Sequence, residues 1–279
     1  MIRLLLGLTL ALTGALTAPS GPASADDPPS LTMVSAPSVD GVRRYGGTLV
    51  ADPGRWTPAP SRAAYVWLRD GVPAATGVRH PIAPDDVGHR LDLQVTVSAP
   101  GYADTTTRVA LGVIRHRVDV RRTVRYSFRV RGQVHADVRA FRRLAQQTYD
   151  DPRGWRGKGV RFVPVRRGGA FTLWLSTARR VPSFSGECSA TWSCRVGRNV
   201  VVNVARWQHA SPAWNRAGRS MRDYRHMVVN HETGHWLGYH HASCPRPGAL
   251  APVMMQQSKG TDGCRLNPWP TLRELRRRT

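Results

Sequence analysis

The segment HETGHWLGYHH, residues 231–241, constrains the fold of this chain more than any other part of the sequence. Residues four apart on an α-helix are separated by about 40° around the helix axis, so His231 and His235 would project from one face, one turn apart. Imidazole nitrogens are good zinc ligands, and a catalytic zinc site keeps three protein ligands and one open position. The segment therefore predicts a helix that binds a metal ion, with zinc as the expected cofactor.

A third histidine can join this pair only if the chain leaves the helix. A continuing helix would place Tyr239 next in line, whereas Gly238 can take the positive-φ conformation that ends a helix and turns the chain back. Two histidines follow, and neighbouring residues in extended chain point to opposite sides. The spacing H-E-x-x-H-x-x-G-x-x-H selects His241 as the third ligand and turns His240 away.

Glu232 follows the first histidine of the motif. In an H-E-x-x-H helix this carboxylate takes a proton from the water that the metal activates. Five residues of fixed type at fixed offsets would arise by chance in a chain of this composition with a probability of about 10⁻⁵. The pattern therefore favours a functional site, with Glu232 as its catalytic base.

A methionine-bearing segment, PVMMQ at 252–256, lies downstream of the motif. The motif and this segment together resemble the metzincin group of zinc peptidases, in which a turn containing a methionine lies beneath the metal. Met254, thirteen residues after His241, best matches the methionine of that turn. Two residues further on, where some metzincins carry a tyrosine that assists the transition state, this chain has Gln256, so the resemblance does not imply a tyrosine-assisted mechanism.

The resemblance extends over residues 124–270. The segments that carry it are YDDPRGW, FTLWLS, SCRVGRNVVVNVARW, VVNHETGHWLGYHH, APVMMQQSKG and GCRLNPWP. This part of the chain resembles an uncharacterised, mainly actinobacterial family of secreted zincin-like proteins, a domain of unknown function. The resemblance implies a metzincin-like fold and names no substrate.

The first 25 residues have the order of a secretory signal peptide. Arg3 precedes an apolar run at 4–16, and the A-x-A sequence at 23–25 precedes Asp26. A spanning helix needs about 20 apolar residues, so an N-terminal membrane anchor is the less favoured alternative and no stable membrane span is expected. The polar stretch 26–30 would be a linker, and the protein is expected outside the cell, free or associated with the cell wall.

Four cysteines, Cys188, Cys194, Cys244 and Cys264, lie in the last hundred residues. Export favours disulfides. Four cysteines allow three pairings, and we expect Cys188–Cys194 with Cys244–Cys264 because both loops close over short distances. A structural zinc site is the alternative, although the chain has no C-x-x-C spacing.

Residues 31–113 alternate with period two in short runs such as AAYVWLRDG and RLDLQVTVSAPG, divided by Gly, Pro and Asp. This pattern predicts a small antiparallel β-sandwich with Trp56, Tyr65 and Trp67 as core candidates. Asp70-Gly71 is a hairpin turn signal. GGTLVADPGRW, YVWLRDG and APDDVGHRLDLQVTVSAPGY resemble a bacterial immunoglobulin-like module, without its disulfide, and imply a spacer or adhesion role.

Residues 114–279 form the second predicted domain. Strands are expected in TVRYSFRV, GVRFVPV, FTLWLST and RNVVVNVARW, with a helix at 136–150 after the first. This order favours an α+β or α/β unit, a mixed sheet with helices packed on it, and the metzincin resemblance implies the α+β form. The last long helix is expected to begin at Ser220, with Asp223 as its capping partner, and to stop at Gly238, whereas the basic tail RELRRRT is expected to be disordered.

The charge of the chain is uneven. Residues 26–113 hold eight Arg and nine Asp, whereas 114–279 hold thirty Arg and two Lys against nine acidic residues. Such a field attracts polyanions, and for an exported protein we expect anionic wall polymers as partners. A compositional bias toward Arg is the simpler explanation. The sequence has no zinc finger, RNP-type strand or helix-turn-helix signature, so no nucleic-acid partner is expected.

These features predict a secreted zinc metallopeptidase that cleaves protein or peptide substrates. His231, His235 and His241 would hold Zn²⁺, and Glu232 would act as base and then as proton donor to the leaving amine. An edge strand at 171–176 would align an extended substrate by backbone pairing, as in related enzymes. Two alternatives stay open: a wall-associated adhesion protein with a structural or vestigial zinc site, and a zinc amidase that acts on wall peptides.

Overall fold

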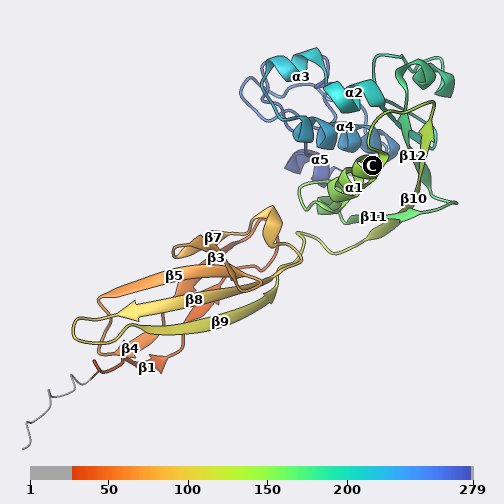
Figure 1. Ribbon diagram of the computed structural model, residues 1–279. Coiled ribbons are helices and arrows are strands. Elements are labelled where there is room, and N and C mark those ends of the chain that lie inside the picture. The colour runs from red at the N-terminus through yellow and green to blue at the C-terminus, as the bar shows by residue number, and fades with distance from the viewer. Residues whose placement is uncertain (1–26, 278–279) are drawn as a thin grey trace, which may run out of the picture.

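The computed structural model describes residues 27–277, and the predicted signal peptide, residues 1–25, lies outside this range. Two large hydrophobic cores lie in the described part of the chain (Figure 1). One is built from buried residues of the stretch 31–114 and the other from buried residues of 124–254, and the two share no member. The described residues therefore contain two separate cores, and we call the parts built around them the N-terminal unit (31–114) and the second unit (122–277).

The N-terminal unit is built from antiparallel strands in three sheets, with the strand orders β6-β5-β8-β9, β2-β3-β7 and β1-β4. Trp56 and Trp67 are buried as expected, and Tyr65 is half-buried. Asp70 and Gly71 both have positive φ and turn β5 into β6, as predicted for this hairpin. The strands are β1 (Thr32–Ser35), β2 (Ser38–Asp40), β3 (Thr48–Asp52), β4 (Arg55–Thr57), β5 (Arg62–Arg69), β6 (Val72–Thr76), β7 (Arg79–Pro81), β8 (Arg90–Ser98) and β9 (Thr105–Val113).

The second unit contains a mixed five-stranded sheet with the order β11-β10-β12-β14-β13. The first four of these strands run parallel, and β13 runs antiparallel to β14. The mixed sheet expected from the sequence is therefore present. Its strands are β10 (Arg122–Arg131), β11 (Val160–Val165), β12 (Phe171–Ser176), β13 (Cys194–Val196) and β14 (Asn199–Asn203).

Two expectations about these strands are wrong. The strand at 171–176, expected at an edge, is β12, and it pairs with β10 on one side and with β14 on the other. The edge of the sheet on that side is formed by β13, a strand of only three residues that pairs with β14. The run at 198–207 also divides, because the side chain of Asn203 accepts a hydrogen bond from the amide of Ala205 and starts a helix there.

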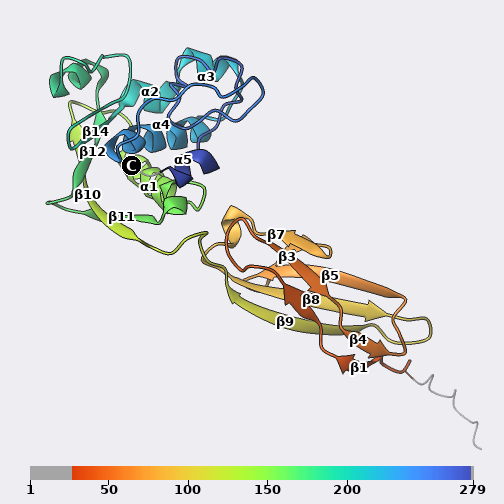
Figure 2. The same ribbon diagram turned by 180° about the vertical axis from the view of Figure 1, so that it is seen from behind.

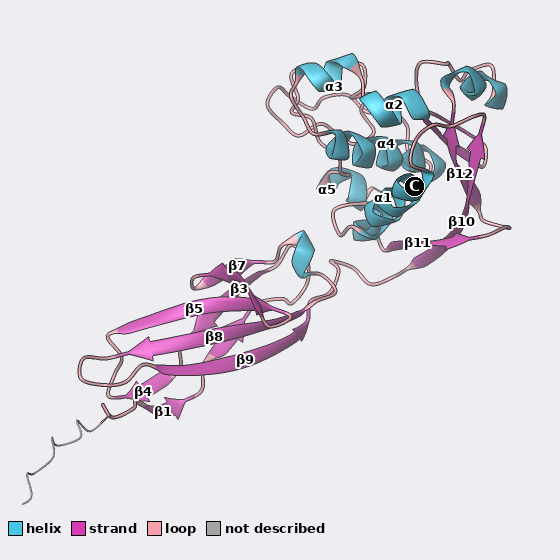
Figure 3. Cartoon of the chain, viewed as in Figure 1, coloured by secondary structure: helices cyan, strands magenta, loops and turns pink. Residues whose placement is uncertain are grey.

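Helices α1 and α4 contact each other, and α1 contacts β11 while α4 contacts β13 and β14 (Figures 2 and 3). None of the helices in the described range is long and apolar enough to cross a membrane. Part of the tail expected to be disordered is helical: residues 272–276 form a helix that Thr271 and Glu274 start with a capping box. The helices are α1 (Val138–Asp150), α2 (Val204–His209), α3 (Pro212–Arg216), α4 (Met221–Trp236) and α5 (Leu272–Arg276).

Candidate metal centre

Helix α4 begins and ends where the sequence indicated. The hydroxyl of Ser220 accepts a hydrogen bond from the amide of Asp223, which satisfies one of the free donors at the helix start. Leu237 is the C-cap, and Gly238 follows with a φ of 94°, a conformation that favours glycine. The chain then turns back toward the helix, so that residues on both sides of the turn can meet.

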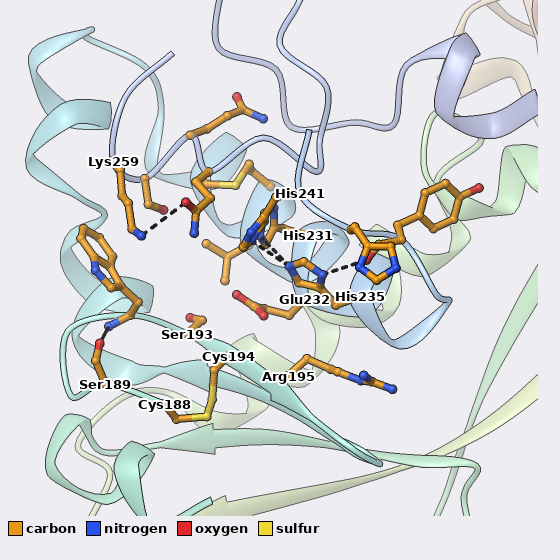
Figure 4. Close-up of a pocket in the computed structure, with 18 of the residues that line it drawn as sticks. Cys188, Ser189, Ser193, Cys194, Arg195, His231, Glu232, His235, His241 and Lys259 are labelled. Atoms are coloured by element: carbon orange, nitrogen blue, oxygen red, sulfur yellow. Dashed lines mark hydrogen bonds between the residues drawn. A yellow bond between two sulfur atoms is a disulfide. The ribbon is translucent and has the colours of Figure 1, made fainter. Parts of the chain in front are cut away.

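The turn brings His231, His235 and His241 together (Figure 4). The Nε2 atom of His235 lies 3.2 Å from Nε2 of His231 and 3.1 Å from Nε2 of His241. The three candidate ligand atoms all lie within 4.8 Å of one another, and the group can hold a metal ion. His240 is exposed and does not belong to the cluster.

Backbone carbonyls orient two of these rings. Nδ1 of His231 lies 2.8 Å from the carbonyl oxygen of Val253, and Nδ1 of His235 lies 2.9 Å from that of Tyr239. A carbonyl oxygen can only accept, so both Nδ1 atoms carry the proton and donate it. The Nε2 atoms of these neutral rings are therefore unprotonated and present lone pairs to one another.

This donor set fits a zinc ion. The lone pairs of His231 and His235 face each other at 3.2 Å, and they repel unless a cation lies between them. Nitrogens bound at about 2.0–2.1 Å to one tetrahedral zinc ion lie about 3.3 Å apart, close to the separations in this cluster. Outer hydrogen bonds from the Nδ1 atoms to carbonyl oxygens are also what metal-binding histidines usually make.

Burial sets the charge of the cluster. It lowers the pKa of His231 to about 3, and it also lowers the pKa values of His235 and His241. All three rings are therefore neutral near pH 7, the form in which imidazole binds a metal. The same effect raises the pKa of the Glu232 carboxyl to about 8, and a cation held by the adjacent histidines would lower this pKa again.

A pocket of about 450 Å³ opens beside the cluster. Figure 4 shows the carboxylate of Glu232 between the histidines and Ser193, on the pocket side. The floor comes from α4, and one wall comes from β13 and the loop before it, including the Cys188–Cys194 disulfide. The opposite wall is the segment 256–259. Glu232 and the Nε2 atoms of the cluster thus border a space large enough for part of a substrate.

The sequence did not indicate part of the pocket lining. Trp192 lies outside the segments that suggested a function, and Arg195 and Lys259 lie in such segments without an expected role. Strand β13 has only three residues, too few for alternation to be recognised, although the glycine at 197 in SCRVGRN does mark a turn before β14. Gln256, which occupies the position of the tyrosine of some metzincins, lines the pocket, and its side-chain oxygen accepts a hydrogen bond from Lys259.

Met254 is buried against α4, at Gly234. A Cβ atom on Gly234 would overlap the sulfur of Met254, so this helix position has room for glycine alone. The residue before it, Val253, supplies the carbonyl that accepts from His231. The turn at 253–254 thus packs under the helix and also orients one of the three histidines.

Glu274 of α5 holds this turn in place. Its buried carboxylate accepts hydrogen bonds from the amides of Val253 and Met254, at 3.1 and 2.9 Å. It also accepts from the amide and the hydroxyl of Thr271. The hydroxyl of Tyr239 donates to the carbonyl oxygen of Glu274 and accepts from Lys158. The C-terminal helix therefore supports both backbone segments that orient His231 and His235.

The structure contains two disulfides with the pairing expected from the sequence. Cys188 is bonded to Cys194, and Cys244 is bonded to Cys264. The first fixes the loop before β13 at the wall of the pocket, whereas the second joins the segment after His241 to the segment that follows the Met254 turn. Both segments that approach the cluster from outside α4 are thus covalently restrained.

One family model matches the chain, over residues 96–269, and its description is "Protein of unknown function (DUF3152)". The match covers more than half of the chain and includes α4, the histidine cluster and the Met254 turn. It begins within β8, so it also includes the last strand of the N-terminal unit. No curated protein and no solved structure matches the chain.

Proposed function

This chain belongs to the DUF3152 family of proteins of unknown function, and we propose that it is a secreted zinc-dependent endopeptidase. The observation that carries the proposal is the convergence of the Nε2 atoms of His231, His235 and His241 beside the Glu232 carboxylate, at the edge of an open pocket. A purely structural zinc site has four protein ligands and is closed to solvent. The three-histidine set and its exposed member, His241, support the catalytic alternative.

In this proposal the histidines, Glu232 and the residues that orient the histidine rings have separate roles in peptide hydrolysis. The three histidines would hold the ion, which when bound lowers the pKa of a water molecule and polarises the scissile carbonyl. Glu232 takes the proton from the attacking water and passes it to the leaving amine. Val253 and Tyr239 keep the rings of His231 and His235 in the tautomer that leaves Nε2 free.

The substrate-aligning strand is reassigned from β12 to β13. Strand β13 lines the pocket at Cys194, Arg195 and Val196, and it pairs only with β14 within the described residues. A strand with a free edge can pair with an extended peptide through backbone hydrogen bonds. We place the substrate backbone along this edge, with the scissile bond next to Glu232.

We also propose a metzincin-like fold for the second unit, an immunoglobulin-like fold for the first, and an extracellular location. A five-stranded mixed sheet with an antiparallel edge strand, a histidine-bearing helix and a buried methionine turn supports a metzincin-like architecture for the second unit. Antiparallel sheets that share one core support an immunoglobulin-like module for the first. The disulfides support an extracellular location.

The test compares wild type with Glu232→Ala. Both proteins should contain about one zinc per chain by elemental analysis, because Glu232 is not a ligand. Cleavage of a broad peptide library should fall by about 10²–10⁴-fold in the variant, the usual contribution of a general base. Glu187→Ala is a matched control, because it removes a glutamate that lines the same pocket and does not belong to the histidine cluster.

Equally poor cleavage by wild type and Glu232→Ala, with zinc present in both, would rule out the peptidase. That result would favour the adhesion-protein alternative, in which the zinc is structural. Digestion of purified cell wall instead of peptides, with the same dependence on Glu232, would identify the zinc amidase.

A further inference from the structure

The sheet of the second unit has one face that none of the helices α1–α5 of the described range covers at β10 and β11. Helices α1 and α4 lie on the other face, where Val124 and Tyr126 of β10 are buried in the core (Figures 1 and 2). Because side chains alternate along a strand, Arg125 and Arg129 point to the uncovered side, and both are exposed. Arg161 of β11 alternates with buried Val160 and Phe162 and is also exposed.

The strand register places these three arginines in a row. Thr123 of β10 is paired with Arg161 of β11, so Arg161 is a diagonal neighbour of Arg125. Arg129 lies four residues further along β10. With a rise of about 3.3 Å per residue, the row from Arg161 to Arg129 extends over about 20 Å. We call Arg125, Arg129 and Arg161 the basic face.

The charges of the basic face are not neutralised within residues 27–277. The ion pairs of arginines from the second unit are Arg153 with Asp151 and Arg219 with Asp223, and neither pair lies on this face. Asp150, at the end of α1, acts on Arg161 electrostatically but forms no ion pair with it. Like charges held in a row repel one another, and a bound polyanion would remove this repulsion.

We propose that the basic face binds a linear polyol-phosphate polymer. Guanidinium groups bind phosphate through paired N–H donors, and a row of three suits a chain of repeating phosphodiesters better than a single small anion. Single-stranded nucleic acid needs aromatic side chains for base stacking. Trp174 and Phe184, aromatic residues on this side, pack against each other, and the indole N–H of Trp174 donates to Asn199, so neither ring is free for a base.

The basic face and the metal centre can act independently. The face lies on the far side of the sheet from α1, and the histidines are carried by α4 and the turn after it. A polymer bound there would hold the protein at an anionic wall while the pocket stays open. This inference does not depend on the proposed peptidase activity.

The experiment measures the binding of fluorescent poly(glycerol phosphate) by anisotropy, at salt concentrations between 50 and 300 mM. The variant R125Q/R129Q/R161Q should bind at least about tenfold more weakly at 100 mM salt, and its log–log salt slope should be smaller by about 2, because fewer counterions are released. The matched control is R139Q/R143Q/R216Q, which removes the same charge from exposed positions on α1 and α3. This control should stay within about twofold of wild type.

Equal weakening by the two triple variants would overturn the proposal, because binding would then depend on net charge alone. Tighter binding of a single-stranded oligonucleotide of the same charge would assign the face to nucleic acid and would also overturn it. So would binding to vesicles of anionic phospholipid with the same dependence on the three arginines. Near-ultraviolet circular dichroism of both variants checks that the fold is kept.

Discussion

Nδ1 of His231 donates a hydrogen bond to the carbonyl oxygen of Val253 across 2.8 Å, and this contact joins the helix of the candidate metal centre to the turn beneath it. It fixes the ring tautomer and directs Nε2 toward His235. The metal centre is therefore more than a helical motif, since its geometry also depends on residues that lie 22 positions further along the chain.

The doubled histidine gives the first prediction. His241→Ala removes a ligand atom from the cluster, so zinc affinity should fall by at least about 100-fold, because one of three ligands is lost. His240→Ala changes an exposed ring outside the cluster and should leave zinc affinity within about threefold. Competition with a chromophoric chelator measures both values. If His240→Ala loses zinc and His241→Ala keeps it, the assignment of His241 as the third ligand is wrong.

The second prediction concerns Glu274. Its carboxylate oxygens accept four hydrogen bonds. In Glu274→Gln an NH₂ group replaces one of these oxygens, so at least one of the four donors would face another N–H instead of an acceptor. A buried donor left without a partner costs about 1–3 kcal/mol, so the free energy of unfolding in urea should fall by at least this amount.

Zinc affinity should also fall in Glu274→Gln, because the turn that orients His231 is released. Glu187→Gln is the control, since Glu187 is exposed and its side chain lies outside this network. If Glu274→Gln unfolds at the wild-type urea concentration and binds zinc as tightly, the C-terminal helix does not support the metal centre.

What the sequence predicted well was local. The roles of Ser220, Gly238 and His241 follow from backbone geometry within one helix and its exit turn. In the structure Ser220 caps the start of α4, and Gly238 has positive φ directly after the C-cap residue. The 3.6-residue period of the helix is enough to predict which side chains share a face, because this depends only on residues close together in the sequence.

What the sequence did not predict depends on contacts between distant segments. The apolar run of β12 was expected at an edge, but a strand's neighbours are set by the order in which strands join the sheet. The residues of β12 are buried or half-buried on both sides of the strand, which is typical of an interior parallel strand. Glu274 escaped notice because the turn it holds is 20 residues away, and a charged tail usually remains solvated.

The third prediction uses the contact between Gly234 and Met254. Alanine is favoured over glycine inside a helix by about 1 kcal/mol. At Gly234, however, the added Cβ would overlap the sulfur of Met254 and approach the ring of Trp155, and overpacking costs about 1–3 kcal/mol. Gly234→Ala should therefore destabilise the protein in urea unfolding.

A double-mutant cycle separates this overlap from other effects of Gly234→Ala. Met254→Ala alone leaves a cavity and should cost about 2–5 kcal/mol. The double variant G234A/M254A should cost less than the sum of the two single changes, because each substitution relieves the other. Gly260→Ala is a control at an open position, and additive costs in the cycle would refute direct contact between Gly234 and Met254.

The last prediction concerns acid stability and His226, a buried residue of α4 outside the metal centre. Its Nδ1 lies 2.8 Å from the hydroxyl oxygen of Thr148, which donates its own proton to Leu144 and so accepts from the histidine. The ring also packs against Trp269. Burial, reinforced by Arg222, lowers the pKa of His226 from 6.5 to about 4, and Asp151 opposes this shift without cancelling it.

The unfolded chain therefore binds a proton at His226 at a higher pH than the folded chain does. Above pH 6.5 both states are neutral at this residue, and as the pH falls from 6.5 toward 4 the unfolded state gains the proton first, so stability is lost in this window. His226→Gln should be less stable than wild type at pH 7.5, because the ring packing is lost. The difference in free energy of unfolding between wild type and His226→Gln should shrink between pH 7.5 and pH 4.5. The decrease should exceed about 1.4 kcal/mol, the equivalent of one pKa unit.

Urea unfolding at pH 7.5, 6.0 and 4.5, with EDTA present so that zinc loss does not contribute, measures this difference. His116 has a pKa lowered to about 4 as well, so wild type alone would not isolate His226, whereas the difference between wild type and His226→Gln does. If the stability difference between wild type and His226→Gln stays constant from pH 7.5 to 4.5, His226 has the same pKa in the folded and the unfolded chain.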